Sequence, residues 1–64
     1  MALGKKLRRL REQRGLPQET LARRAGLPHT YVARIERGEI TSPRVETRRK
    51  LATVLGVPVT ELLD

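Results

Sequence analysis

The first apolar pattern along the chain has the spacing of an amphipathic helix. Leu3, Leu7 and Leu10 lie at positions i, i+4 and i+7, which is one face of a helix over about residues 2–14. The other face of this helix is basic. Such a helix can also lie on an anionic membrane surface, but this one is short, lacks a Trp or Phe anchor and is followed by more patterned helices. A packed first helix, ended by Gly15, is the favoured interpretation.

Two further short helices are expected over residues 18–25 and 29–37. Each has apolar residues on one side at helical spacing, Leu21, Ala22 and Ala25 in the first and Tyr31, Val32 and Ile35 in the second. The connection between them, Gly26-Leu27-Pro28, has a glycine for a left-handed helix end and a proline suited to a first helical turn. Two helices joined by such a turn are the helix-turn-helix signature, which predicts a DNA-binding unit over about residues 18–37.

The opposite side of the third expected helix is polar and basic, with a small residue in its middle. It carries His29, Thr30, Ala33, Arg34 and Arg37. A helix that buries one side and offers the other to an anionic surface has this pattern. Arg34 has the geometry for a bidentate contact with guanine, Thr30 could hydrogen-bond a base or touch a thymine methyl group, and Ala33 leaves room for close approach.

A polar connection over residues 39–42 leads to a fourth expected helix. Ser42 and Pro43 are expected as its N-cap and first residue, and Gly56 closes it. Its buried stripe is expected to consist of Val45, Leu51, Ala52 and Leu55. Arg48 interrupts this stripe: either its stem packs while its head reaches water, or the register is slightly shifted.

A last short helix is expected over about residues 59–63, with Leu62 and Leu63 closing the core. The chain is thus predicted to be all-α, with five short helices in a single domain over residues 1–64. A chain of 64 residues buries only a small core, and no room is expected for a small-molecule ligand.

The composition argues against several classes of protein. Without cysteine, neither a disulfide framework nor a thiolate metal site is possible, and His29, the single histidine, has no second ligand in reach. The longest apolar runs are a few residues, which is too short for a membrane span, and the N-terminus lacks the apolar region of a secretory signal. We therefore expect an intracellular protein that needs no metal or other cofactor.

The net charge of +7 favours a polyanion as partner, although an ordinary domain can carry such a charge for solubility. RNA is the weaker choice, because single-strand recognition depends on stacking aromatic residues and Tyr31 is the only one. Catalysis is not expected, because the carboxylates are scattered and no nucleophile or acid–base pair is recognisable. A protein-interaction module, such as an antitoxin or co-regulator whose basic face is secondary, stays as the alternative.

Five pieces of the sequence together resemble the Cro/C1-type helix-turn-helix family of phage and bacterial repressors. They are LRRLREQRGL at 7–16, QETLA at 18–22, AGL at 25–27, RIERG at 34–38 and LGV at 55–57. Their order and spacing are those of the family, and they span nearly the whole chain. The resemblance implies a compact lambda-repressor-like fold and a transcriptional regulator that binds specific sequences in double-stranded DNA, with its third helix in the major groove.

The resemblance also implies roles for single residues. Those expected to face base edges are His29, Thr30, Tyr31, Ala33 and Arg34. Those expected to bind DNA phosphates are Gln18, Arg37, Thr41 and Arg44. The position of Gln18, in a first helical turn beside unpaired backbone N–H groups, suits that role. Arg11 and Glu36 resemble a partly buried ion pair between the first and third helices; the alternative is two unrelated surface charges.

The chain departs from the family's pattern at a few positions. Pro17 and Pro28 stand where Ser or Thr usually caps a helix, and Arg48 replaces a usual core residue. Glu39 stands where a basic residue is common, which predicts one weakened phosphate contact. None of these departures alters the helix-turn-helix spacing.

Proteins of this kind normally bind DNA as dimers, because half-sites lie about one helical turn apart. The region expected to be exposed and to form the contact is Val57, Pro58, Val59 and Leu62; alternatively, all of these residues belong to the core. A patch this small predicts a weak homodimer that DNA strengthens. The expected place of action is the cytoplasm of a bacterium, or of a phage host, at the nucleoid, and without contact to a membrane.

Overall fold

The computed structural model describes residues 3–63, which form four α-helices and one 3-10 helix. In chain order these are α1 (Leu3–Gln13), α2 (Gln18–Arg24), α3 (Tyr31–Glu36), α4 (Val45–Leu55) and η1 (Val59–Leu62). The all-α class is confirmed, and the fifth expected helix is a single turn of 3-10 type rather than an α-helix. No helix within residues 3–63 has the length and apolar content needed to cross a bilayer.

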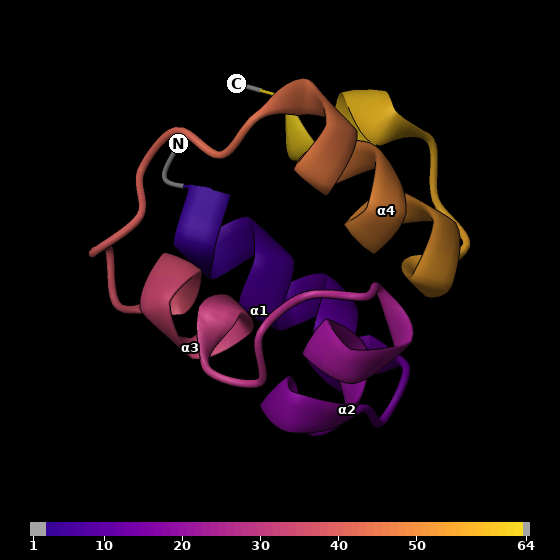
Figure 1. Cartoon of the computed structure of the whole chain (residues 1–64). Helices are drawn as coiled ribbons and strands as arrows, with labels where there is room; N and C mark the ends of the chain where they lie inside the picture. The colour runs from indigo at the N-terminus through magenta and orange to yellow at the C-terminus, as the bar shows by residue number, and fades with distance from the viewer. Residues whose placement is uncertain (1–2, 64) are drawn as a thin grey trace.

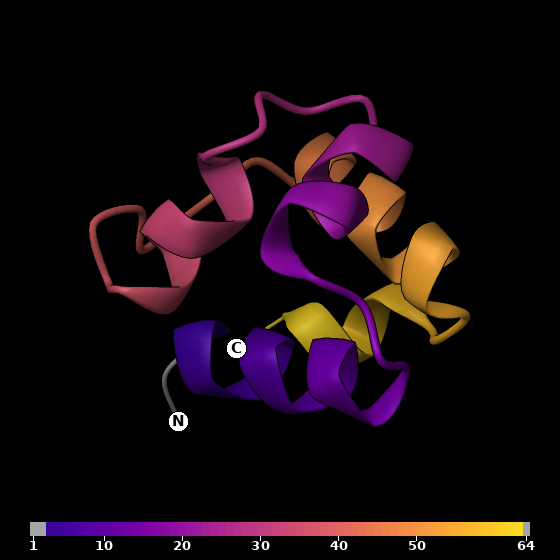
Figure 2. The same ribbon diagram turned by 90° about the horizontal axis from the view of Figure 1, so that it is seen from below.

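The helices enclose one core from several sides (Figure 1). Helix α2 contacts both α3 and α4, whereas α1 contacts α3 and η1. In the view from below, α1 and η1 lie on one side of the core and α2 on the other, with α3 and α4 at the two ends (Figure 2). This arrangement leaves the outer side of α3 uncovered by any other helix.

The core is aliphatic, as the composition requires. Its fully buried large side chains are Leu7, Leu21, Val32, Ile35, Leu51, Leu55 and Leu62. Every helix supplies at least one of them, so each helix is held by burial of its own apolar face, at about 1.5–3 kcal/mol for each such side chain. The face expected for the first helix is confirmed, because Leu3, Leu7 and Leu10 are all buried.

Glycines are required by the backbone at the places where the pattern predicted helix ends, and two of them illustrate the reason. Gly26 and Gly56 both have φ near 72°, a left-handed conformation that L side chains rarely adopt. A third, Gly4, is needed for space rather than for φ. A Cβ atom built there would lie 2.6 Å from the carbonyl oxygen of Ile35, so α1 and the end of α3 approach as closely as they do only because position 4 has no side chain.

Two predicted helix starts are wrong by a few residues. Helix α3 begins at Tyr31 rather than at His29, because the N–H of Tyr31 donates to Pro28 O (2.9 Å) and closes a tight turn first. Helix α4 begins at Val45, with Arg44 in an extended conformation at the N-cap. Pro43, expected as the first helical residue, is instead buried in the connection before the helix.

The stripe predicted for α4 is right for Leu51, Ala52 and Leu55 and wrong for Val45, whose residue surface is 50% exposed. Arg48 explains the difference, because its half-buried side chain occupies the inward position one turn later. Its Nε donates to Pro43 O (2.9 Å) and its Nη1 to Leu62 O (3.1 Å). The side chain is half-buried, as one alternative expected for its stem, and its head donates to two backbone carbonyls. Leu62 closes the core as expected, whereas Leu63 is 38% exposed.

Candidate nucleic-acid interface

The turn between α2 and α3 fixes how the two helices meet. After α2, the N–H of Gly26 donates to Arg23 O (3.0 Å) and that of Leu27 to Ala22 O (2.9 Å). These bonds satisfy carbonyls that the helix end would otherwise leave unpaired. Leu27 packs against the core as a partly buried residue, so the chain turns sharply before α3 begins.

Polar residues follow one side of α3 at helical spacing. Thr30 accepts a hydrogen bond from the N–H of Arg34 (3.1 Å), and Ala33 accepts one from Arg37 (2.9 Å), so these four residues form a stripe of i, i+3, i+4 and i+7 positions. Thr30, Arg34 and Arg37 are exposed and Ala33 is half-buried. Val32 and Ile35, on the other side of the helix, are buried. A continuous polar and basic strip therefore faces outward.

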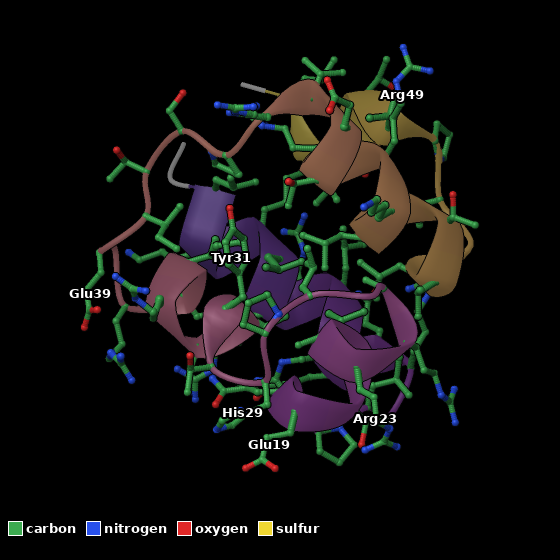
Figure 3. The ribbon with its side chains drawn as sticks, in the orientation of Figure 1. Glu19, Arg23, His29, Tyr31, Glu39 and Arg49 are labelled. Carbon is green, nitrogen blue, oxygen red and sulfur yellow. The ribbon has the colours of Figure 1, made fainter. Side chains whose placement is uncertain are left out.

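His29 and Tyr31 lie beside this strip in different surroundings. His29 is exposed in the turn before α3, whereas Tyr31 is half-buried and packs against the core. Figure 3 shows Glu39 at the edge of the molecule beyond α3, and His29 in the turn before α3. Of the five residues predicted to face bases, Tyr31 is thus the one whose side chain also packs against the hydrophobic core.

A charge cluster that the sequence reasoning missed lies at the end of the strip. Glu39 Oε2 accepts a hydrogen bond from Arg37 Nε (2.8 Å), and Glu39 Oε1 lies 3.4 Å from Arg34 Nε. The hydrogen bond from Arg37 is the main cause that holds the pKa of the Glu39 carboxyl below its ordinary value, and the same bond raises the pKa of Arg37. Separations of five and two positions are not those that bring side chains together on a helix, so helical spacing did not reveal the cluster.

Gln18 is the first residue of α2, as predicted, but its side chain has an additional partner. Its Nε2 donates to Glu36 Oε1 (2.9 Å), which ties the start of α2 to the end of α3. A side-chain amide nitrogen carries two N–H donors. The contact with Glu36 therefore uses one donor of Gln18 and fixes the direction of the side chain.

The structure contains the ion pair between α1 and α3. Arg11 donates from Nε to Glu36 Oε2 (2.7 Å) and from Nη2 to Glu36 Oε1 (3.0 Å), while its Nη1 donates to Leu16 O (2.8 Å). The two side chains are only 11% and 4% exposed. The hydrogen bonds with Glu36 are the main cause that raises the pKa of Arg11. These two residues are therefore framework and not surface charges.

Two further arginines resemble Arg11 in binding backbone carbonyls. Arg14 donates from Nε to Leu55 O at the end of α4 and from Nη1 to Leu10 O (3.3 Å). Arg48 joins the segment before α4 to η1, as described above. Arg11, Arg14 and Arg48 thus use guanidinium donors to hold the framework, although Arg14 is itself exposed.

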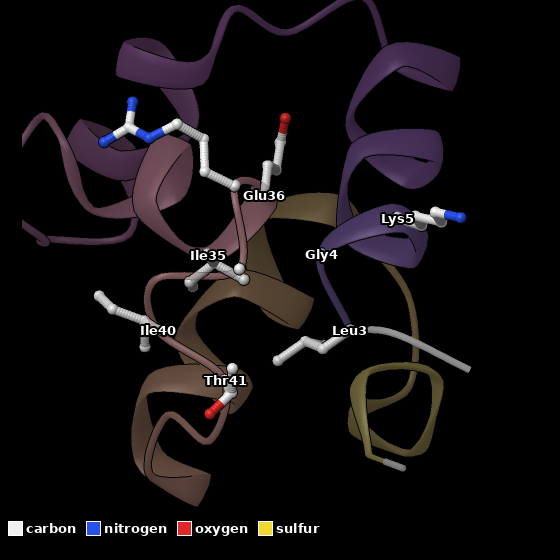
Figure 4. Close-up of a pocket in the computed structure, with 9 residues that line it drawn as sticks. Leu3, Gly4, Lys5, Ile35, Glu36, Ile40 and Thr41 are labelled. Atoms are coloured by element: carbon white, nitrogen blue, oxygen red, sulfur yellow. The ribbon is translucent and has the colours of Figure 1, made fainter.

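Thr41 and Arg44, the remaining predicted phosphate ligands, are both exposed in the connection between α3 and α4. Thr41 also borders a hollow of about 370 Å³ between the start of α1 and the chain that follows α3. Figure 4 shows the apolar side chains of Leu3, Ile35 and Ile40 that line it. The hollow by itself does not show whether a small molecule binds there, so the expectation that the chain binds none stays a prediction.

The region predicted to mediate dimerisation is only partly exposed. Leu62 is 1% exposed and belongs to the core, so its assignment to a dimer surface is wrong. Its side chain faces inward because η1 packs against α4 and α1. Val57 and Val59 are partly buried against the same core, and Pro58 is exposed.

Within residues 3–63, no group of His, Cys, Asp or Glu side chains is arranged to hold a metal ion.

Comparison with known proteins finds similarity to helix-turn-helix proteins in both sequence and structure. A helix-turn-helix family model (HTH_3) matches residues 7–62. The HTH-type transcriptional regulator PuuR of Escherichia coli K12 is 38% identical over 64 residues, which are all of this chain and 34% of PuuR. The chain therefore spans about a third of the length of this curated relative.

Two solved structures are similar over nearly the whole chain. The restriction-modification controller protein C.AhdI from Aeromonas hydrophila superposes with a TM-score of 0.88 at 43% identity, covering 95% of this chain and 91% of that one. The biofilm master regulator SinR, in a crystal structure with DNA, superposes with a TM-score of 0.90 at 34% identity, covering 97% and 98%. These likenesses include the helices that carry the polar strip.

Proposed function

The chain belongs to the Cro/C1-type helix-turn-helix family, and from that premise we propose that it is a transcriptional regulator that binds specific sequences in double-stranded DNA. The observation that carries the proposal is the outward strip on α3, formed by Thr30, Ala33, Arg34 and Arg37 on a helix whose other side is buried. Such a helix fits the major groove, where an exposed polar face can reach base edges. Further support is that SinR, which shares this fold, was crystallised with DNA.

In the proposed complex, His29, Thr30 and Arg34 read bases. Arg34 offers its guanidinium for a bidentate contact with guanine, and Ala33 permits close approach of the helix to the groove floor. Tyr31 would touch the flank of this surface, because its ring is half-buried. Phosphate contacts, which set register without carrying sequence information, are assigned to Gln18, Arg37, Thr41 and Arg44.

The proposed unit of recognition is the helix-turn-helix over residues 18–37, with α1, α4 and η1 as its frame within a single domain. We further propose that two copies bind DNA together, because a second half-site adds contacts that one short helix cannot supply. The proposed contact region is reduced to Val57, Pro58 and Val59. Its small area predicts weak pairing in solution and stronger pairing on DNA, at the nucleoid of a bacterial or phage-infected cell.

Selection of duplexes from a random pool tests the proposal directly. We expect a preferred sequence to emerge, with an inverted repeat if two copies bind together. The affinity for the selected duplex should fall linearly with salt on a log–log plot, because cations are released from each contacted phosphate. Enrichment of no sequence, together with salt-insensitive binding to a protein partner, would instead favour a co-regulator that acts through protein contacts.

A further inference from the structure

We propose that Glu39 is a positioning residue for DNA recognition, which holds Arg34 and Arg37 by their Nε atoms so that both guanidinium groups approach DNA in a fixed mutual arrangement. This inference rests on the proposed function, because it concerns the same strip on α3. It adds a role for a carboxylate that would otherwise only repel the phosphates of DNA.

The contacts of Glu39 leave the recognition ends of both arginines available. Each carboxylate oxygen serves one arginine, Oε2 with Arg37 Nε at 2.8 Å and Oε1 with Arg34 Nε at 3.4 Å. Nε lies next to the aliphatic stem, and the two terminal amino groups of a guanidinium lie beyond it. A bidentate contact with guanine or phosphate can use those terminal groups. Contact through Nε therefore orients each side chain without occupying the atoms that would meet DNA.

The backbone fixes where the carboxylate sits. The chain reverses at Gly38, whose φ is 83°, and the N–H of Glu39 then donates to Arg34 O (2.9 Å). The next N–H, that of Ile40, donates to the same oxygen (3.2 Å). Glu39 is thus attached to the last turn of α3, and its carboxylate is directed at Arg34 in that helix and at Arg37, its C-cap residue.

The energetic consequence has two opposing parts. All three side chains are about half exposed, from 48% to 59%, so each ion pair alone contributes little. One carboxylate shared by two arginines nevertheless restricts both, which reduces the conformational freedom that each would lose on binding DNA. Its negative charge also weakens the general attraction to phosphates. Neutralising Glu39 should therefore strengthen non-specific binding and weaken base discrimination.

The test compares the wild-type chain with Glu39→Gln on two duplexes. One is the duplex selected from a random pool by the wild type, and the other is a scrambled duplex of the same composition. We expect the variant to bind the scrambled duplex about two- to fivefold more tightly, while the ratio of the two affinities falls by a similar factor. Glu12→Gln is the matched control, because Glu12 also pairs with an exposed arginine, Arg8 (3.3 Å), but on α1.

A ratio that stays unchanged while both affinities rise equally would overturn the positioning role and leave only charge repulsion. If the wild type prefers no duplex at all, the proposed function itself fails. A measurement without DNA separates the two cases: the Nε–H resonances of Arg34 and Arg37 in nitrogen-15 NMR spectra should shift on Glu39→Gln and not on Glu12→Gln. Absence of that shift would remove the ordering on which the inference rests.

Discussion

The carboxylate of Glu36 accepts hydrogen bonds from both Arg11 and Gln18, and so joins α1, α2 and α3 at one nearly buried point. The bond to Gln18 ties a predicted phosphate ligand to the frame. The bonds to Arg11 compensate a charge that is only 11% exposed. Because Gln18 begins α2 and Glu36 ends α3, the orientation of α3 relative to the start of α2 depends on this junction.

Glu36→Ala should destabilise the fold by about 2–4 kcal/mol, because it leaves the charge of Arg11 nearly buried without its partner. Urea denaturation followed by circular dichroism measures the loss. The exposed pair of Arg8 and Glu12 provides the control, since Glu12→Ala should change stability by less than about 1 kcal/mol. Similar losses for both variants would contradict the assignment of Glu36 to the framework.

Arg34→Ala and Arg44→Ala should weaken DNA binding in different ways. Loss of Arg34 should relax preference at one base pair, by about 1–3 kcal/mol of discrimination. Loss of Arg44 should weaken binding to every sequence alike and reduce the log–log salt slope by about 1. Binding assays on the selected duplex and its single-base variants separate these outcomes. Equal losses for both substitutions on all sequences would argue against the division of roles.

Gly4→Ala should destabilise the chain although alanine is the better helix former. The intrinsic preference for alanine is worth about 1 kcal/mol, but its Cβ atom would lie 2.6 Å from Ile35 O and 3.0 Å from Glu36 O. Backbone oxygens cannot move aside as a flexible side chain can, so we expect a net loss of about 1–3 kcal/mol. Thermal denaturation of Gly4→Ala beside Lys5→Ala, an exposed position on α1, tests this. Stabilisation by Gly4→Ala would show that α1 can shift away from α3.

The stability that the ionised carboxylate of Glu39 contributes should be lost at acid pH. Its carboxyl has a pKa lowered from the ordinary value of 4.5, so its contribution is complete above about that pH and disappears as the pH falls through the lowered value. The stability difference between wild type and Glu39→Gln should therefore be constant from pH 6 to 8 and shrink below about pH 4.5. The opposite sign holds for Arg11, whose pKa is raised mainly by its hydrogen bonds with Glu36, so its contribution should not change over this pH range. A difference that does not change down to pH 3 would contradict the ionised pair.

Leu62→Ala should lower the stability of the single chain, by about 2–4 kcal/mol, because the side chain is fully buried. The loss should not depend on protein concentration. Pro58→Ser, at an exposed position, should instead leave the unfolding of the single chain almost unchanged and weaken any pairing seen by analytical ultracentrifugation with DNA. A concentration-dependent loss for Leu62→Ala would restore this residue to a dimer surface.

Periodicity predicted the fold well where a helix has one apolar side. The leucines of α1, the buried residues of α3 and the last two turns of α4 lie where their spacing placed them. The same argument wrongly placed Val45 in the core. Helical periodicity predicts which face of a helix is apolar, but not how far along the helix other elements cover that face. Val45, in the first turn of α4, lies outside the core. The inward position one turn later is taken by Arg48, whose hydrogen bonds to backbone carbonyls cannot be predicted from a hydrophobic pattern.

The candidate site was predictable in part, for a similar reason. Helical spacing alone placed Thr30, Ala33, Arg34 and Arg37 on one side, and the hydrogen bonds along α3 agree with it. The ion pairs of Glu39 depend on how the chain reverses at Gly38, which spacing does not describe. Gln18 was predicted as a phosphate ligand but not as a partner of Glu36, because that contact joins two helices whose packing had to be known first.

Arg11, Arg14 and Arg48 each donate to a backbone carbonyl. These arginines hold the fold together, whereas those on the strip of α3 are available for recognition, and a count of positive charges does not distinguish the two groups. A lysine at any of these sites would keep the charge but could not supply donors in the planar fork of a guanidinium. Exchange of lysine for arginine on α3 would instead alter recognition and leave the scaffold intact. Substitutions on the surface strip should therefore change DNA binding, whereas substitutions at these three arginines should change the stability of the fold.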